Sequence, residues 1–125
     1  MTSTSEPTAQ HFVLSLGSNV EAERYIPYAL EALREELCIT RETALMQTKP
    51  VDFPYPSADF TNVVLWGHTD KSREELCQLL SALEDYAGRR RETPALVPLD
   101  VDLLIWNGVV LKPKDLLRPY MQGLL

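Results

Sequence analysis

Apolar residues follow two different periods along this chain of 125 residues. A short apolar run at residues 11–16 stops at the turn signal Gly17-Ser18-Asn19, so a first strand is predicted there. From Ile26 the apolar residues recur at the spacing of a helix face, and Pro27 is expected in the first helical turn, where its missing N–H costs little. Residues 39–48 are rich in β-branched side chains and predict a second strand.

The second half of the chain repeats this order. Residues 60–69 predict a third strand, and Ser72 with Glu75 forms the capping-box pattern of a second helix that Gly88 ends. Residues 99–106 predict a fourth strand, and residues 108–113 a short extra one. The helix is expected to bury four leucines, which are Leu76, Leu79, Leu80 and Leu83.

The order strand, helix, strand, strand, helix, strand predicts an α+β fold. It is the βαββαβ order of a ferredoxin-like sandwich, in which an antiparallel sheet carries its helices on one face. We expect one domain at residues 11–125, preceded by a disordered tail at residues 1–10. Since this fold hosts many unrelated activities, it does not decide the function.

Charge and apolar content narrow the class of partner. With a net charge of −6, the chain is a poor match for nucleic acid or an anionic membrane surface, and no apolar run approaches the ~20 residues of a membrane span. Cys38 and Cys77 lie in apolar helical stretches and are expected to be buried free thiols in a reducing cytoplasm. His11 and His68 are expected at the surface. An oligomer is possible but not indicated.

Two carboxylates interrupt the apolar fourth strand. Because strand side chains alternate between faces, Asp100 and Asp102 are expected to share one face, roughly 7 Å apart. Like charges this close raise a pKa unless a cation lies between them, and Mg²⁺ satisfies the pair most simply. The alternative is that both aspartates face solvent, although Asp is depleted in strands. The opposite face is expected to carry Leu99, Val101, Leu103 and Ile105.

Three consecutive arginines, Arg89, Arg90 and Arg91, precede this strand. Guanidinium groups bind phosphate oxygens bidentately. Taken alone, the triplet is more typical of a solvated helix end. Together with the carboxylate pair it favours a magnesium nucleotide site, in which arginines bind the phosphates and aspartates bind the metal.

The loop after residue 50 and the third strand offer groups for a flat ring. Phe53, Tyr55 and Phe60 are suited to stack on a heterocycle, although aromatics near a strand start are usually core residues. The Asn62 amide both donates and accepts hydrogen bonds, which suits a ring with mixed donors and acceptors. The turn at residues 17–19 either presents backbone amides to a ligand or is simply a turn.

Six short motifs, in their order and spacing, resemble the 6-hydroxymethyl-7,8-dihydropterin pyrophosphokinase family. They are LSLGSN near the start, TKP at 48–50, FTN at 60–62, LEDYAGRRR at 83–91, PLDVDLLIWNG at 98–108 and RPY at 118–120. The resemblance covers nearly the whole chain after residue 10, and residues 84–102 are its most specific part. It implies a ferredoxin-like enzyme of folate synthesis that transfers the pyrophosphate of ATP to the pterin hydroxymethyl group and releases AMP, with two Mg²⁺ ions.

The resemblance implies roles at the nucleotide. Asp100 and Asp102 would hold both Mg²⁺ ions between their carboxylates and the ATP phosphates. Arg89 and Arg91 match arginines that bind phosphate and join the aspartates as catalytic residues. Glu84 would lie beside the nucleotide.

The resemblance also implies a pterin site. Phe60 matches the family's stacking aromatic, Asn62 matches the amide that reads the ring, and Thr48 matches a backbone contact to the ring edge. We place Phe53 in the same substrate-binding set. Tyr120 stands where the family has a histidine that helps to bind ATP, and we place it in the nucleotide-binding set.

The chain also differs from the family pattern. Family members have a longer loop before the aspartates, with a tryptophan that covers the pterin, and an arginine where Val97 stands. They continue past the position of Leu125 into an arginine and a second stacking aromatic. We therefore expect either a pyrophosphokinase without these contacts or a protein of the same fold that binds a pterin or nucleotide without converting it. The retained carboxylate pair favours the first, because a pure binder has little need of it.

Overall fold

The computed structural model describes residues 9–50, 53–88 and 92–124. Arg89, Arg90 and Arg91 lie outside the described residues, as do residues 1–8 of the predicted tail. The elements run in the order β1 (Gln10–Ser18), α1 (Ala22–Glu36), β2 (Cys38–Glu42), β3 (Met46–Thr48), β4 (Phe60–Thr69), α2 (Arg73–Ala87), β5 (Asp100–Trp106), β6 (Val109–Val110), α3 (Pro113–Leu116) and a 3-10 turn (Pro119–Met121).

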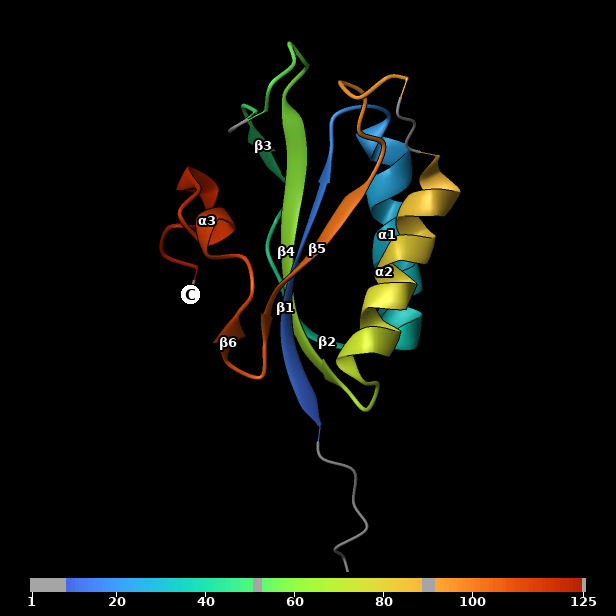
Figure 1. Ribbon diagram of the computed structural model, residues 1–125, viewed down its shortest axis with the longest axis vertical. Coiled ribbons are helices and arrows are strands. Elements are labelled where there is room, and N and C mark those ends of the chain that lie inside the picture. Colours follow the sequence, from blue (N-terminus) through green and yellow to red (C-terminus); the bar gives the residue numbers. More distant parts are fainter. Residues whose placement is uncertain (1–8, 51–52, 89–91, 125) are drawn as a thin grey trace, which may run out of the picture.

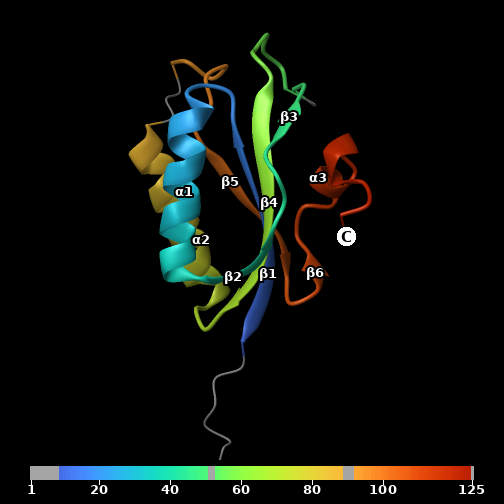
Figure 2. The ribbon, with the colours of Figure 1, turned by 180° about the vertical axis from the view of Figure 1, so that it is seen from behind.

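The strands form one antiparallel sheet with the order β2-β4-β1-β5-β6, and β3 also pairs with β4. Figure 1 shows α1 and α2 side by side along one face of this sheet, and Figure 2 shows the same layering from behind. The predicted ferredoxin-like α+β sandwich is confirmed. The short α3 and the C-terminal segment lie on the opposite face (Figure 1).

The main core fills the space between the two long helices and the sheet. Helix α1 contributes an amphipathic stripe, and α2 contributes three of its four predicted leucines as buried residues, with Leu79 partly buried. Burial of such apolar surface is the main stabilising contribution to folding. The fully buried anchors of this core include Leu14, Leu16, Ile26, Leu33, Leu65, Leu76 and Leu99.

A smaller apolar cluster occupies the other face of the sheet. Val13, Val64 and Leu104 project from three neighbouring strands, and Met121 of the 3-10 turn packs on them. Leu116 and Tyr120 lie against the same cluster. The C-terminal segment is therefore fixed by its own apolar contacts, and this fixes the polar residues beside them.

One predicted face assignment is wrong. The register between β1 and β5 shifts between Val13, opposite Ile105, and Leu14, opposite Leu103, so Leu104 is an extra residue on β5. Such a β-bulge reverses the alternation beyond it. Ile105 therefore packs with the small cluster, whereas Leu99, Val101 and Leu103 stay in the main core as predicted.

The ends of α2 follow the local sequence signals, whereas the start of α1 does not. The capping box of α2 is present, with Glu75 N–H bonded to Ser72 Oγ and Ser72 N–H bonded to Glu75 Oε1. Gly88 ends α2 in the left-handed conformation, as predicted. Helix α1 begins at Ala22, four residues before Ile26, so Pro27 lies inside the helix rather than in its first turn.

Three smaller predictions need correction. The strand predicted at residues 39–48 is two strands, β2 and β3, separated by residues 43–45, of which Thr43 is still hydrogen-bonded to Val64 of β4 through its N–H and its Oγ1. Gln10, placed in the N-terminal tail by the prediction, belongs to β1. Cys38 and Cys77 are free, but both are exposed rather than buried, since each lies on the solvent side of its element.

Among the described residues, every helix is too short or too polar to span a lipid bilayer.

Candidate active site

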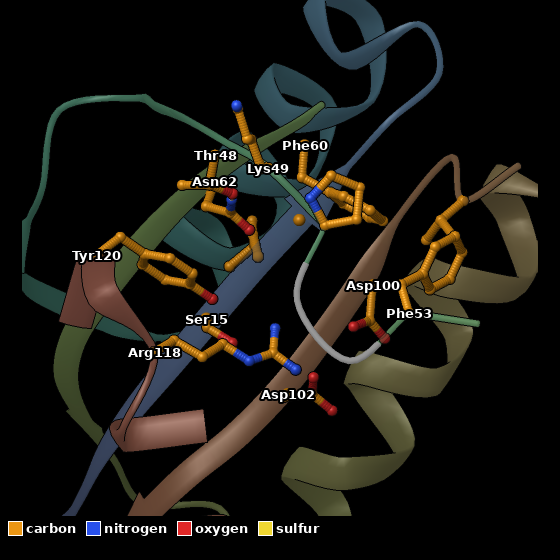
Figure 3. A pocket seen from close by; sticks show the side chains of 14 residues that line it. Ser15, Thr48, Lys49, Phe53, Phe60, Asn62, Asp100, Asp102, Arg118 and Tyr120 are labelled. Carbon is orange, nitrogen blue, oxygen red and sulfur yellow. The ribbon is translucent and has the colours of Figure 1, made fainter. Parts of the chain in front are cut away.

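The two aspartates lie on one face of β5, as the alternation predicts. Asp100 is opposite Gly17 and Asp102 is opposite Ser15 in the β1 register. Both side chains are partly buried, while Val101 between them enters the main core. Figure 3 shows both carboxyl groups directed at one cavity.

The environment of the pair raises the pKa of Asp102 to about 7. Burial is the largest cause, and the charge of Asp100 and a hydrogen bond between the two carboxyl groups add to it. Lys112 opposes the shift, with its Nζ 3.8 Å from Asp102 Oδ1. A raised pKa is what the sequence predicts for two carboxyl groups this close with no cation between them.

Glu84 fixes the segment that carries the pair. Its Oε2 accepts a hydrogen bond of 2.8 Å from the backbone N–H of Val101. The short β6 pairs with Ile105 and Trp106, further along β5, so at Val101 a side chain of α2 takes the place of a neighbouring strand. Glu84 therefore holds the strand backbone between the two aspartates.

A first cavity, which we call the ring pocket, lies on the aspartate face of the sheet. Its volume is about 140 Å³. Its walls combine aromatic, amide and charged side chains from β1, β3, β4, β5 and the C-terminal segment. The lining includes Gly17, Thr48, Lys49, Phe53, Phe60, Asn62, Val97, Asp100, Asp102, Arg118 and Tyr120.

An amide and a hydroxyl form the polar wall of the ring pocket. Asn62 of β4 is buried, and its Nδ2 donates a short hydrogen bond to Thr48 Oγ1 of β3. Gly17 of β1 lies opposite Asn62, and a Cβ at Gly17 would be 3.0 Å from Asn62 Oδ1. The absence of a side chain at residue 17 therefore leaves room for the amide in this orientation.

Two aromatic rings form the apolar wall. Phe53 meets Phe60 edge to face, with ring centroids 5.6 Å apart, and it also meets Tyr55 edge to face. Figure 3 places Phe53 beside Asp100 and Phe60 near Thr48. The loop after residue 52 thus brings an aromatic side chain to the carboxylates, which sequence spacing alone does not show.

The turn at residues 17–19 supports a loop rather than presenting free amides. Asn19 N–H donates to Val97 O at 3.0 Å, Asn19 Nδ2 donates to Ala95 O at 2.7 Å, and Val97 N–H donates to Asn19 Oδ1 at 2.6 Å. These three bonds fix residues 95–97 beside the site. Val97 is 2% exposed and gives the ring pocket an apolar wall.

The C-terminal segment adds a cation and a phenol. Arg118 Nη2 lies 3.1 Å from Asp115 Oδ1, and the guanidinium group also donates to the Tyr120 hydroxyl. Burial raises the pKa of Tyr120, and the negative charges of Asp115 and Asp102 raise it further, although Arg118 acts in the opposite direction. Tyr120, predicted at the nucleotide, lines the ring pocket.

A second cavity, which we call the helix pocket, lies between α2 and β5 and has a volume of about 340 Å³. Arg73, Cys77, Ser81 and Glu84 line it from α2, at the spacing of one helix face. Asp102 lines both the helix pocket and the ring pocket. Asp102 therefore lies where the two cavities meet, and Asp100 faces the ring pocket beside it.

The structure brings most of the predicted site together. Thr48, Phe53, Phe60, Asn62 and Tyr120 surround the ring pocket with the two aspartates, and Glu84 lines the helix pocket. Four charged residues at or beside the site were not predicted from the sequence, namely Lys49, Lys112, Asp115 and Arg118. For Arg118 a signal was present, because it begins the RPY motif. Arg89 and Arg91, predicted as catalytic, lie outside the described residues.

The carboxylate pair fits a hard divalent cation. Both ligands are carboxylate oxygens, and a cation between them would remove the repulsion that raises the pKa of Asp102. Among the described residues, no group of three His, Cys, Asp or Glu side chains is placed to hold a metal ion. A Mg²⁺ ion at Asp100 and Asp102 would therefore take its other ligands from water and phosphate.

The fold and the site define an α+β sandwich with an acidic centre between two cavities. The sequence model of the 7,8-dihydro-6-hydroxymethylpterin-pyrophosphokinase (HPPK) family matches residues 13–122, and the chain belongs to this family. The match covers every site residue that the structure describes. No curated protein matches the chain.

Proposed function

We propose that this protein transfers the pyrophosphate group of ATP to 6-hydroxymethyl-7,8-dihydropterin, a step of folate biosynthesis, and releases AMP. Membership of the pterin pyrophosphokinase family supports this activity. The observation that carries the proposal is the position of Asp102, which lines both cavities. If the pterin occupies one cavity and ATP the other, the carboxylate of Asp102 lies where the pyrophosphate group passes from ATP to the pterin.

The ring pocket suits the pterin. A pterin is flat and carries both donors and acceptors at its edge, and the pocket offers one aromatic wall and a buried amide. Asn62 and Thr48 would bind the ring edge, and Phe60 would lie against the ring face. In this orientation the hydroxymethyl group would point toward Asp100 and Asp102, which lie across the cavity from Thr48 (Figure 3).

The helix pocket suits the nucleotide. It is the larger cavity and is lined by apolar side chains of α2 and β5, with Glu84 and Lys112 among its polar groups. Its end at Asp102 would place the phosphates beside the carboxylate pair. Glu84, already bonded to the backbone of Val101, would act by positioning that pair.

Two Mg²⁺ ions held by Asp100 and Asp102 would neutralise the phosphate charge and orient the triphosphate. The pterin hydroxyl oxygen forms a bond to the β-phosphorus of ATP. The bond from this phosphorus to the oxygen that bridges to the α-phosphorus breaks, AMP leaves, and the hydroxyl proton is released. The protein's residues mainly position the substrates and neutralise charge, which is what this class of transfer requires.

The alternative is a protein that binds a pterin or nucleotide without converting it. The raised pKa of Asp102 argues against a protein that binds only a pterin, because a like-charge pair is costly to hold in a partly buried position unless a cation binds there. A protein that holds a Mg²⁺ nucleotide without converting it would use the same pair, so the release of AMP decides between that protein and the transferase.

Product analysis tests the proposal. The protein is incubated with ATP, Mg²⁺ and 6-hydroxymethyl-7,8-dihydropterin, and the products are separated and followed by ³¹P NMR. We expect AMP and the pterin diphosphate in equal amounts. ADP, or saturable binding of pterin with no AMP, would contradict the proposal, and the second result would support the binding protein.

A further inference from the structure

A cation reaches the acidic site from the C-terminal segment. Arg118 lines the ring pocket together with Asp100 and Asp102. Figure 3 shows its guanidinium group passing Ser15 and pointing toward Asp102. The side chain is 35% exposed and lines the cavity.

Two neighbours from the same segment hold this guanidinium group. Asp115 Oδ1 lies 3.1 Å from Nη2, and the Tyr120 hydroxyl accepts a hydrogen bond. Burial alone would lower the pKa of Arg118, but the bond to Tyr120 and the charges of Asp115 and Asp102 raise it above its ordinary value. A guanidinium group has five N–H donors, so these two partners still leave donors for a ligand in the cavity.

The charge of Asp102 acts on Arg118 but is not its closest negative partner, and Asp102 has another cation beside it. Lys112 Nζ is 3.8 Å from Asp102 Oδ1, and the ion pair of Arg118 is with Asp115. On the other walls of the ring pocket, Val97 is apolar and Lys49 lies beside Thr48, away from Asp102 (Figure 3). Arg118 is thus the cation that, among the described residues, faces the aspartates from the ring-pocket side.

We propose that Arg118 binds the β- and γ-phosphates of the nucleotide as they pass from the helix pocket to the ring pocket. This inference rests on the proposed function. Because Arg118 lines the ring pocket, its contact falls on the phosphates that are transferred and not on the α-phosphate that stays with AMP. The planar fork of a guanidinium group binds two phosphate oxygens at once, and Asp115 with Tyr120 holds the fork in place.

Calorimetric binding of α,β-methylene-ATP tests the contact, since this analogue has no cleavable bond between its α- and β-phosphates. With Mg²⁺ present, we expect Arg118→Gln to bind the analogue 10- to 100-fold more weakly than the native protein. AMP, which lacks the β- and γ-phosphates, should bind both proteins equally. Arg118→Lys should recover part of the loss, because it restores the charge but not the fork.

Lys114→Gln is the matched control. It removes one positive charge from the same segment, but Lys114 is exposed and lies outside both pockets. It should bind the analogue as the native protein does. Thermal unfolding of each variant shows whether it is folded.

Two results would overturn the inference. Arg118→Gln could bind the analogue within twofold of the native protein, or lose affinity for AMP and the analogue alike. Tighter binding of Mg²⁺ alone by this variant, with unchanged analogue affinity, would make Arg118 a counter-ion of the aspartates. Because the analogue is not converted, these outcomes are separate from the product analysis. If the native protein releases no AMP but Arg118→Gln still weakens analogue binding, the proposed function is contradicted and the role of Arg118 is not.

Discussion

Glu84 on α2 accepts a hydrogen bond from the backbone N–H of Val101, the residue between the two aspartates of β5, at 2.8 Å. The bond joins a helix to the strand that carries the acidic centre. Glu84 therefore has a structural role, the support of the β5 backbone, which its position before the arginine triplet does not suggest. The residue supports the geometry of the site through the backbone, whether or not it also contacts the nucleotide.

Two substitutions of Glu84 measure what its hydrogen bond to Val101 contributes to stability. Glu84→Gln keeps an oxygen acceptor for Val101, so we expect it to retain most of the stability, whereas Glu84→Ala leaves the N–H without its acceptor and costs about 1–3 kcal/mol. Urea unfolding measures this difference. Asp85→Ala, an exposed neighbour on the same helix, is the control and should cost less than about 0.5 kcal/mol. Equal stability of Glu84→Ala and the control would show that the bond contributes little.

The titration of Asp102 gives the protein a pH-dependent stability. Its pKa in the folded state, about 7, lies above the ordinary value of 3.8, so the folded state binds the proton more tightly than the unfolded state. The stabilisation is therefore complete below about pH 4 and is lost as the pH rises to 7. In the metal-free protein we expect the free energy of unfolding to fall by up to about 4 kcal/mol over this range, because each unit of pKa difference contributes about 1.4 kcal/mol.

Asp102→Asn should remove most of this decline, because an amide does not titrate. Denaturant unfolding at several pH values between 4 and 8, with a chelator present, compares the variant with the native protein. If both proteins lose the same free energy between pH 4 and 7, the decline belongs to other groups. Mg²⁺ should stabilise the native protein more at pH 8 than at pH 6, since the ion competes with the proton.

The buried amide of Asn62 is expected to decide pterin affinity. Asn62→Ala removes the donor and acceptor and should weaken pterin binding by about 10- to 100-fold, the equivalent of one or two well-formed hydrogen bonds. Fluorescence titration with 6-hydroxymethylpterin measures this. Gln47→Ala, an exposed change on the neighbouring β3, should leave the affinity unchanged. Undiminished binding by Asn62→Ala would remove this residue from the ring site.

A substitution at Gly17 tests the position of the Asn62 amide, because Gly17 lies opposite Asn62 on the neighbouring strand. In Gly17→Ala the new methyl group would lie 3.0 Å from Asn62 Oδ1, so the amide must move by a few tenths of an ångström. We expect a severalfold loss of pterin affinity with a stability loss of about 1 kcal/mol. Gly67→Ala provides the contrast, because its Cβ would be 2.2 Å from Cys38 O and should destabilise the fold by more than about 3 kcal/mol. Chemical unfolding of both variants checks this order.

Local patterns predict the frame of this molecule well. The capping box at Ser72, the left-handed Gly88 and the alternation of Asp100 with Val101 depend on neighbours within a few residues, and each appears in the structure as the sequence indicates. The start of α1 does not follow from such a pattern. Glu21 takes a left-handed conformation and gives no side-chain cap, so the helix begins without the usual signal.

Contacts between distant segments were harder to predict. The bulge at Leu104 places both Leu104 and Ile105 in the small cluster, away from the main core, and no local pattern in the sequence marks it. Arg118 reaches the aspartates only because the segment after β6 folds back over the sheet, held there by Met121 and its apolar neighbours. The spacing of residues along the chain does not predict that this segment folds back over the sheet.

The role of Asp102 in the transfer is tested by the rate of pterin-dependent AMP release, compared between the native protein and Asp102→Asn. Asp70→Asn, an exposed change between β4 and α2, is measured beside them as the control for loss of one carboxylate. If the aspartate at the junction of the two pockets serves the transfer, the native protein and the control release AMP at similar rates and Asp102→Asn falls by at least about 100-fold. Similar AMP release by all three proteins would contradict the account.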